Sequence, residues 1–318
     1  MVAALIRAAG PRTLPSADAY QQVLAAAIAA FREKSARRRD QTWMMWAAAA
    51  GIAAIAVALV LQWGPTSMQP PAVATVARVI GTVELGSDGS WKPMAEPGET
   101  LAEGAMLRTL AGGGVALALS SGASLRLAAA TEVLLDGPRR IYLRSGMLYL
   151  DNGGSVGTGH QIETPAGTVR DVGTQFELQV ASGALRLRVR EGRVEIGRAG
   201  QLLSSVAGEQ LDIDGLGGVT RSHIAATDIA WQWAEAIGPA PDIDGQPATR
   251  LLAWVARETG RQLRYESAAV EARAATVILH GNIRHLAPLA ALEVMLATTD
   301  LEYTLAGDTM EIRARTER

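Results

Sequence analysis

One long apolar run, from Trp43 to Trp63, constrains this chain more than any other feature, because it contains no charged residue. A helix rises about 1.5 Å per residue, so a run of this length reaches about 30 Å, the thickness of a bilayer core. Tryptophans stand at both ends of the run, where amphipathic rings favour the membrane interface. We therefore expect residues 43–63 to form a transmembrane helix.

The arginines before the run predict its orientation. Arg37–Arg39 stand just before it, and clustered basic residues stay on the cytoplasmic side of a membrane. Residues 1–42 are then cytoplasmic and residues 64–318 lie outside. A cleaved signal peptide is the alternative, with Ala72–Ala74 as the cleavage site, but the run is longer than the apolar part of a usual signal peptide.

Charge and cysteine content exclude several classes of protein. The net charge is −2, and residues 1–40 carry seven basic and three acidic side chains, net +4, so residues 41–318 carry −2 − 4 = −6. The outer part has no basic excess, which argues against nucleic-acid binding. Because there is no cysteine, a disulfide scaffold and a cysteine-based metal or redox site are excluded.

An amphipathic pattern precedes the apolar run. Ser16 can cap a helix that extends to about Arg39. A single helix cannot bury its own apolar stripe, so this one lies on the membrane, pairs with another helix or binds a partner protein. A solvated helix without a partner is the remaining alternative. The stripe, at spacings of three and four, consists of Tyr20, Val23, Leu24, Ala27, Ile28 and Phe31.

We expect residues 64–78 to form a linker, and after it apolar residues recur at every second position. Short stretches between residues 79 and 213 alternate apolar and polar side chains and end at Gly-containing turns such as Ser121-Gly122. About ten such strands predict an all-β domain over residues 79–213. The arginines of Leu185–Arg190 form a one-sided basic ribbon, which strand alternation explains as a solvent-exposed face; a binding role is the alternative.

The last part of the chain predicts a connector and a compact α+β domain. Residues 214–241 form the connector, in which Trp231 and Trp233 are expected to pack against a domain. Residues 242–314 predict the order β-α-β-β-α-β-β. The expected elements are a strand led by Ile243, strands at 262–265, 276–279, 301–305 and 309–312, and helices from Pro247 to Thr259 and from Pro288 onward.

Residues for chemistry on an external substrate are missing from the sequence. His280 and His285, the closest pair of histidines, have no carboxylate or thiol near them in sequence, so no metal site is predicted. No Gly-x-Ser-x-Gly, His-Glu-x-x-His or phosphate-loop motif occurs. The sequence therefore predicts a protein that is not an enzyme and holds no cofactor.

Several stretches resemble the FecR family of periplasmic signal regulators, which couple outer-membrane transporters to alternative sigma factors. They are residues 98–127, 142–150, 162–178 and 187–197, with the ordered series Thr164-Pro165, Gly167, Gly173-Thr174, Phe176 and Glu191-Gly192. Residues 242–260 and 279–296 resemble the short domain shared by secretins, TonB-dependent transducers and FecR-like proteins.

The resemblance implies a single-pass protein of the bacterial inner membrane with its C-terminus in the periplasm. Its cytoplasmic helix then regulates an extracytoplasmic-function sigma factor through Tyr20, Leu24, Ile28 and Phe31. Its C-terminal domain binds the signalling domain of a TonB-dependent transducer, through residues within 242–314 that the sequence does not single out. A membrane-anchored periplasmic scaffold without a sigma partner is the alternative.

The resemblance also implies self-cleavage between Gly173 and Thr174, which occurs in some FecR-like regulators. A Thr hydroxyl can attack the preceding carbonyl, and Asp171 is a nearby carboxylate that can assist the proton transfer. The alternative is that Gly173 is a turn glycine and Thr174 an ordinary strand residue.

Overall fold

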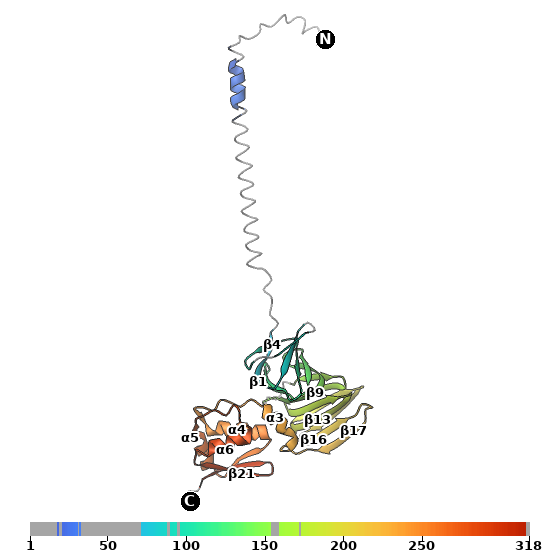
Figure 1. The fold of residues 1–318 in the computed structure, drawn as a ribbon, viewed down its shortest axis with the longest axis vertical. Helices are drawn as coiled ribbons and strands as arrows, with labels where there is room; N and C mark the ends of the chain where they lie inside the picture. The colour runs from blue at the N-terminus through green and yellow to red at the C-terminus, as the bar shows by residue number, and fades with distance from the viewer. Residues whose placement is uncertain are drawn as a thin grey trace. The chain divides into compact units, whose positions relative to one another are not determined.

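The computed structural model describes residues 18, 21–30, 32, 71–87, 90–93, 96–153, 159–171 and 173–315. The chain divides into two compact units, Met1–Met68 and Gln69–Arg318, and Figure 1 draws the elements of both.

The described part of the first unit is helical, as the spacing of its apolar residues predicts. Residues 18, 21–30 and 32 all lie in a helix and are all exposed. The predicted transmembrane helix, residues 43–63, falls outside the described residues. Among the residues that are described, no helix has the length and apolar character needed to cross a membrane.

The second unit begins with a β domain, defined here as residues 71–223. Alternating side chains and glycine turns favour short strands, and the described residues of the domain form seventeen of them. They are β1 Ala72–Ile80, β2 Val83–Ser87, β3 Ser90–Pro93, β4 Thr100–Ala102, β5 Ala105–Thr109, β6 Gly114–Leu119, β7 Ser124–Leu127, β8 Glu132–Leu135, β9 Arg140–Asp151, β10 Gln161–Thr164, β11 Gly167–Asp171, β12 Gln175–Ala181, β13 Ala184–Glu191, β14 Arg193–Arg198, β15 Gln201–Val206, β16 Glu209–Ile213 and β17 Val219–His223.

The strands form two sheets that share the long strand β9. Sheet A has the order β17-β16-β13-β12-β9-β7-β6-β1-β4. Sheet B has the order β3-β2-β5-β8-β9-β10-β11-β14-β15. The first residues of β9 pair in sheet B and its last residues in sheet A, so this one strand joins the two sheets.

Apolar side chains from both sheets meet in one core. Because side chains along a strand alternate between its faces, every second residue points into the space between the sheets. One core row crosses sheet A through Leu127, Leu148, Leu178 and Leu187, which lie opposite one another in the strand register. Sheet B contributes Leu107, Val133, Ile141, Ile162, Val169, Val194 and Ile196.

The β domain begins earlier and ends later than the sequence predicts. The expected linker, residues 64–78, overlaps β1, which pairs with β4 and β6 from Ala72 onward. Val73 and Val76 are buried in the core, so this uncharged stretch supplies core side chains although prolines precede it. At the other end β17 adds a strand beyond residue 213.

The connector, residues 224–241, contains two short helices that lie against sheet A. They are η1 (Ile229–Trp231), which the Asp228 side chain caps, and α3 (Gln232–Ile237). Trp231 is fully buried and meets the Tyr149 ring edge-on, with centroids 6.1 Å apart. α3 contacts β1, β6 and β7. The expectation that these tryptophans pack against a domain is confirmed.

The C-terminal domain, residues 242–315, packs three helices and two small sheets around its own core. Its sheets are β18-β20 and β19-β22-β21, and Figure 1 shows α4, α5 and α6 gathered beside β21. Its elements are β18 Gln246–Pro247, α4 Ala248–Thr259, β19 Gln262–Tyr265, α5 Ala268–Thr276, β20 Ile278–Leu279, α6 Pro288–Leu296, β21 Leu301–Ala306 and β22 Thr309–Ala314.

One helix of this domain differs from the sequence-based expectation. The expected strand at 276–279 is only Ile278–Leu279, because residues 268–276 form the helix α5. The Ser267 side chain caps the N-terminus of α5 by accepting a hydrogen bond from the Val270 N–H. Ile243 starts no strand and instead lies in the core. The order is therefore β-α-β-α-β-α-β-β. The two expected helices, α4 and α6, are confirmed.

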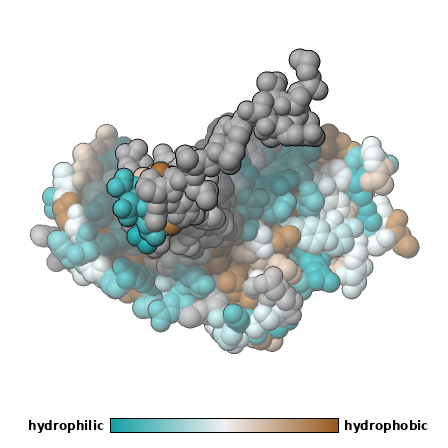
Figure 2. All heavy atoms as spheres, turned by 90° about the horizontal axis from the view of Figure 1, so that it is seen from above, coloured by the Kyte–Doolittle hydropathy of each residue, from teal (hydrophilic) through white to brown (hydrophobic). Residues whose placement is uncertain are grey.

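Among the described residues on the face that Figure 2 shows, apolar side chains are scattered among polar ones.

Candidate functional site

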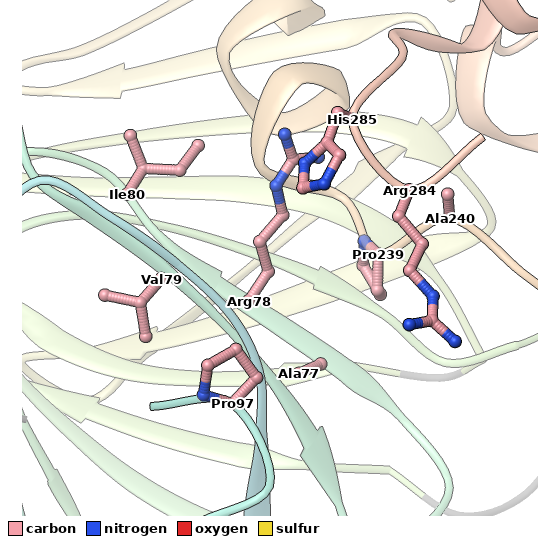
Figure 3. Close-up of a pocket in the computed structure, with 9 residues that line it drawn as sticks. All are labelled: Ala77, Arg78, Val79, Ile80, Pro97, Pro239, Ala240, Arg284 and His285. Atoms are coloured by element: carbon pink, nitrogen blue, oxygen red, sulfur yellow. The ribbon is translucent and has the colours of Figure 1, made fainter. Parts of the chain in front are cut away.

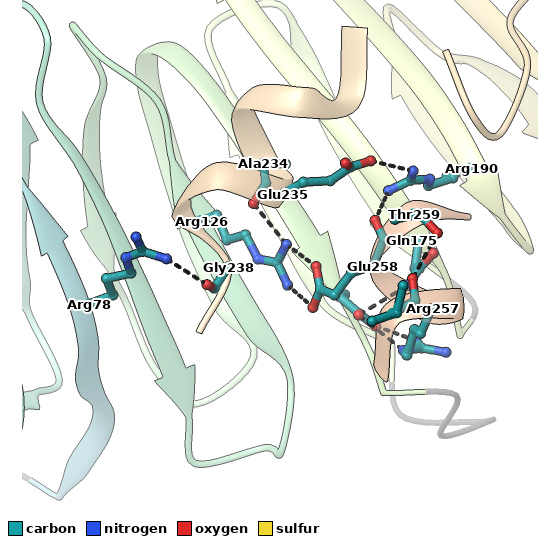
Figure 4. A network of polar contacts seen from close by, with 12 residues as sticks. Arg78, Arg126, Gln175, Arg190, Ala234, Glu235, Gly238, Arg257, Glu258 and Thr259 are labelled. Carbon is teal, nitrogen blue, oxygen red and sulfur yellow. Dashed lines mark hydrogen bonds and ion pairs between the residues drawn. The ribbon is translucent and has the colours of Figure 1, made fainter. Parts of the chain in front are cut away.

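The outer face of sheet A carries a row of polar and aromatic residues that is covered. Arg126, Tyr149, Glu177 and Arg188 lie opposite one another on β7, β9, β12 and β13. The first three are buried, because the connector and α4 lie over them. The charged residues of this row and their polar partners form what we call the junction network, part of which Figure 4 shows. Its members are Arg126, Asp151, Gln175, Glu177, Arg188, Arg190, Trp233, Glu235, Arg257 and Glu258.

A bidentate ion pair stands at its centre. Arg126 donates from Nη1 and Nη2 to the two carboxylate oxygens of Glu258, each at 2.7 Å, and also to the Ala234 carbonyl at 2.9 Å. Burial alone would lower the pKa of Arg126, but Glu258 outweighs burial and raises it. The pair joins β7 to the last turn of α4.

Arg190 makes a second link from the sheet to the connector and α4. It donates to Glu235 at 2.8 Å, to the Glu258 carbonyl at 2.7 Å and to the Ala226 carbonyl at 2.7 Å. The basic ribbon of Leu185–Arg190 is therefore not simply a solvent-exposed face. Alternation places its arginines correctly on one side of β13, but it cannot show that another domain covers that side.

Arg257 of α4 makes the reciprocal link toward the β domain. Its guanidinium donates to both carboxylate oxygens of Asp151 at the end of β9, and Gln175 donates to the same carboxylate at 3.0 Å. Burial by itself would raise the pKa of Asp151, but these hydrogen bonds hold it below its ordinary value. Asp151 therefore remains a carboxylate at neutral pH.

Glu177 and Tyr149 complete the covered row. Trp233 Nε1 donates to Glu177 at 2.7 Å, and Arg188 pairs with the same carboxylate at 3.0 Å. Burial raises the pKa of Glu177 above its ordinary value, although both partners oppose the shift. Burial likewise raises the pKa of Tyr149 to about 12. Each charge in the row thus has a partner, as a buried polar network requires.

Two glycines allow the backbone to approach this network closely. A Cβ atom at Gly238 would lie 2.8 Å from Arg126 Nη1 and 3.1 Å from a Glu258 oxygen. Gly260, which ends α4, has a φ of +64°, and a Cβ there would meet Arg190 Nε at 2.5 Å. The close fit at both positions indicates that the β domain and the C-terminal domain meet in one defined arrangement.

A second cluster surrounds the Gly173-Thr174 dipeptide. Gly173 has a φ of +71°, and Thr174 is buried, with its hydroxyl donating to Asp171 Oδ2 at 3.3 Å. Asn152 Nδ2 donates to the same oxygen at 2.7 Å. Gly192 packs so closely that a Cβ there would lie 2.8 Å from the Gly173 carbonyl oxygen. The structure thus brings together Asp171, Gly173 and Thr174, which the sequence singles out.

Sequence reasoning does not place His160 in this cluster. Its backbone N–H donates to Asp171 Oδ1, and its Nδ1 lies 3.6 Å from the same oxygen. On the other side of the ring, Ser121 Oγ lies 2.8 Å from Nε2. A chain of polar side chains therefore runs from Ser121 through the buried His160 to Asp171 and Thr174. No sequence spacing signals it, because Ser121 lies in the turn after β6 and His160 lies directly before β10.

The other histidines do not converge. His280 Nδ1 lies 3.3 Å from Asp244 on the surface, so it has a carboxylate neighbour in space although none is near it in sequence. His285 lies apart, beside Arg284. Within the described ranges, no group of three or more His, Asp or Glu side chains could hold a metal ion.

The predicted sigma-binding stripe is only partly described. Leu24 and Ile28 are 43% and 45% exposed on the helix of the first unit. Tyr20 and Phe31 lie outside the described residues. The two described members are thus available for a partner, and the role itself stays a prediction.

Fold and sequence together define the class of the second unit: a two-sheet β domain followed by a small α+β domain. The family model described as FecR protein matches residues 105–195, which run from β5 into β14. This stretch of the chain is therefore a FecR domain, and the resemblance seen in the sequence is confirmed there.

Two crystal structures of a putative anti-sigma factor from Parabacteroides distasonis ATCC 8503, at 1.65 and 2.50 Å resolution, are similar to the chain. Each is 14% identical to it with a TM-score of 0.37, and the match covers 66% of this chain and 99% of the other. Among curated proteins, none matches the chain.

Proposed function

We propose that this chain regulates an extracytoplasmic-function sigma factor from the bacterial inner membrane. The observation that carries the proposal is the FecR family match over residues 105–195. In this proposal residues 1–42 contact the sigma factor in the cytoplasm and residues 43–63 cross the membrane. The C-terminal domain receives the signal from a TonB-dependent transducer in the periplasm.

The contacts of the second unit support a path for that signal. Glu258 and Arg257 join α4 to the β domain, and α3 continues the contact to β1. Arg78 of β1 donates to the Gly238 carbonyl at the end of α3, at 3.2 Å. β1 is also the first described strand that follows residues 43–63 in sequence. A change in the position of the C-terminal domain can therefore reach β1 through these contacts.

Binding of the full-length chain to the sigma factor encoded beside it tests the proposal. Burying one Leu or Ile side chain contributes about 1.5–3 kcal/mol, so Leu24→Asp and Ile28→Asp should each weaken binding at least about tenfold. Gln22→Asp adds the same charge on the other face of the exposed helix and should leave binding within about twofold. Equal losses from all three variants would mean that the stripe is not the contact surface.

A membrane-anchored periplasmic scaffold without a sigma partner is the competing function. A scaffold has no need for the apolar stripe, so the same variants should then leave the function of the chain unchanged. Failure of the full-length chain to bind any neighbouring sigma factor favours this alternative.

We also propose that the Gly173-Thr174 bond breaks by self-cleavage. Thr174 Oγ1 attacks the Gly173 carbonyl carbon and passes its proton to Asp171, the C–N bond breaks as the amine takes up that proton, and water then opens the ester. The positive φ of Gly173 and the hydrogen bond from Thr174 to Asp171 support this step.

A denaturing gel of the full-length chain tests the cleavage. Fragments of roughly 18 and 15 kDa are expected from the chain length at a mean residue mass near 105 Da. Thr174→Ala should leave the chain intact, whereas Thr174→Ser keeps a hydroxyl and should still yield both bands. One full-length band from the unmutated protein would reject the proposal.

A further inference from the structure

An open cavity of about 630 Å³ lies where β1, the connector and the loop before α6 come together (Figure 3). Its volume falls in the range of small-molecule sites, about 300–1,000 Å³. The sigma-factor proposal makes no use of this cavity.

Three basic side chains line the cavity, and no acidic residue does. They are Arg78 of β1 and the exposed Arg284 and His285. None of them has a carboxylate partner among the residues that the structure describes, and Arg78 uses one nitrogen to donate to the Gly238 carbonyl. By contrast, Arg273 of the same C-terminal domain pairs with Asp300 at 2.8 Å. The cavity thus offers unused hydrogen-bond donors and uncompensated positive charge.

The rest of the wall is apolar. Ile80, Pro97 and Pro239 contribute to it, and Figure 3 shows them around the Arg78 side chain. Guanidinium groups match phosphate oxygens with paired N–H donors. A phosphate monoester carries about −1.5 to −2 charges near neutral pH, which balances two arginines.

We propose that this cavity binds a phosphate monoester attached to an apolar body. Two sources supply this chemistry, a soluble phosphorylated metabolite and the headgroup of a phosphatidic acid. Since the wall comes from the β domain, the connector and the C-terminal domain, the ligand contacts all three. Binding therefore stabilises their arrangement by mass action.

Calorimetric titration of the full-length chain in detergent micelles tests the site. The probes are phenyl phosphate, and dihexanoyl phosphatidic acid below its micellar concentration. Both should bind, and more weakly in higher salt, because salt screens the charges. Tighter binding of phenyl phosphate identifies a soluble ligand, and tighter binding of the lipid identifies a headgroup.

Two arginine variants supply the matched control. Arg284→Glu should weaken binding of both probes at least about tenfold, since it reverses a charge in the cavity wall. Arg264→Glu reverses an exposed charge on β19, outside the wall, and should change binding less than about twofold. The proposal is overturned if neither probe binds at millimolar concentration, if both variants weaken binding equally, or if uncharged benzyl alcohol binds as well as phenyl phosphate.

Discussion

At the scale of single residues, the Arg126–Glu258 pair decides how firmly the two domains of the second unit are joined. Both side chains are almost fully buried, at 2% and 8% exposure, and each is the main partner of the other. Removing one member of a buried ion pair is far more costly than replacing both, because it leaves a charge without a partner in a poorly solvated place.

This asymmetry gives a double-mutant prediction. Arg126→Met should lower the free energy of unfolding by about 3–5 kcal/mol, and Arg126→Met combined with Glu258→Met should recover most of that loss. Denaturant unfolding of the full-length variants measures both values. Additive losses in the double variant would show that the two residues do not act as a pair.

Asp151 gives a prediction about pH. Its pKa is depressed in the folded state, so its contribution to stability is present above its ordinary pKa of 3.8 and is lost as the pH falls below that value. The midpoint temperature of thermal unfolding should therefore fall more steeply between pH 6 and pH 3 for the unmutated chain than for Asp151→Asn. Parallel curves would contradict the prediction.

At the scale of secondary-structure elements, α3 is held at its C-terminal end by a close fit. Gly238 follows its last residue, and its Cα faces the Arg126–Glu258 pair. Its φ of −50° suits any residue, so only the lack of space requires glycine here.

Gly238→Ala should therefore lower the free energy of unfolding by about 1–3 kcal/mol, because the added methyl group displaces a buried guanidinium. Gly215→Ala is the matched control, since a Cβ there meets its nearest atom at an ordinary 3.7 Å. Denaturant midpoints compare the two. Equal effects would mean that the pair can move aside without cost.

At the scale of the whole molecule, the junction network makes the β domain and the C-terminal domain cooperative. Each has its own core, yet Arg126, Arg190 and Arg257 all bridge them. Domains with separate cores unfold separately when the interface between them contributes little.

Calorimetry of the full-length chain should show one unfolding transition that covers both domains. Glu258→Lys places a third positive charge beside Arg126 and Arg190 and should split this single unfolding transition into two. Glu293→Lys, exposed on α6, makes the same charge change away from the network and should leave one transition. Two transitions in the unmutated chain would show that the network does not couple the domains.

Sequence patterns predict the strands and the helices α4 and α6 because local periodicity and caps determine them. The burial of Arg126 could not be predicted in this way, since Glu258 lies 132 positions further along the chain. The same holds for His160, whose partners are Ser121 in the turn after β6 and Asp171 at the end of β11. The sequence pattern does not predict α5, because its short alanine-rich segment has only a weak apolar face.

The shared strand β9 has a consequence for biosynthesis. A chain made from its N-terminus first presents β9 with its earlier neighbours, β7 and β8, while β10 and β12 have yet to emerge. Until then one edge of β9 is open in each sheet, and open edges invite pairing with other chains. The newly made protein is therefore most exposed to aggregation while residues 152–181 are still being added, and a chaperone that covers extended segments is most useful in that interval.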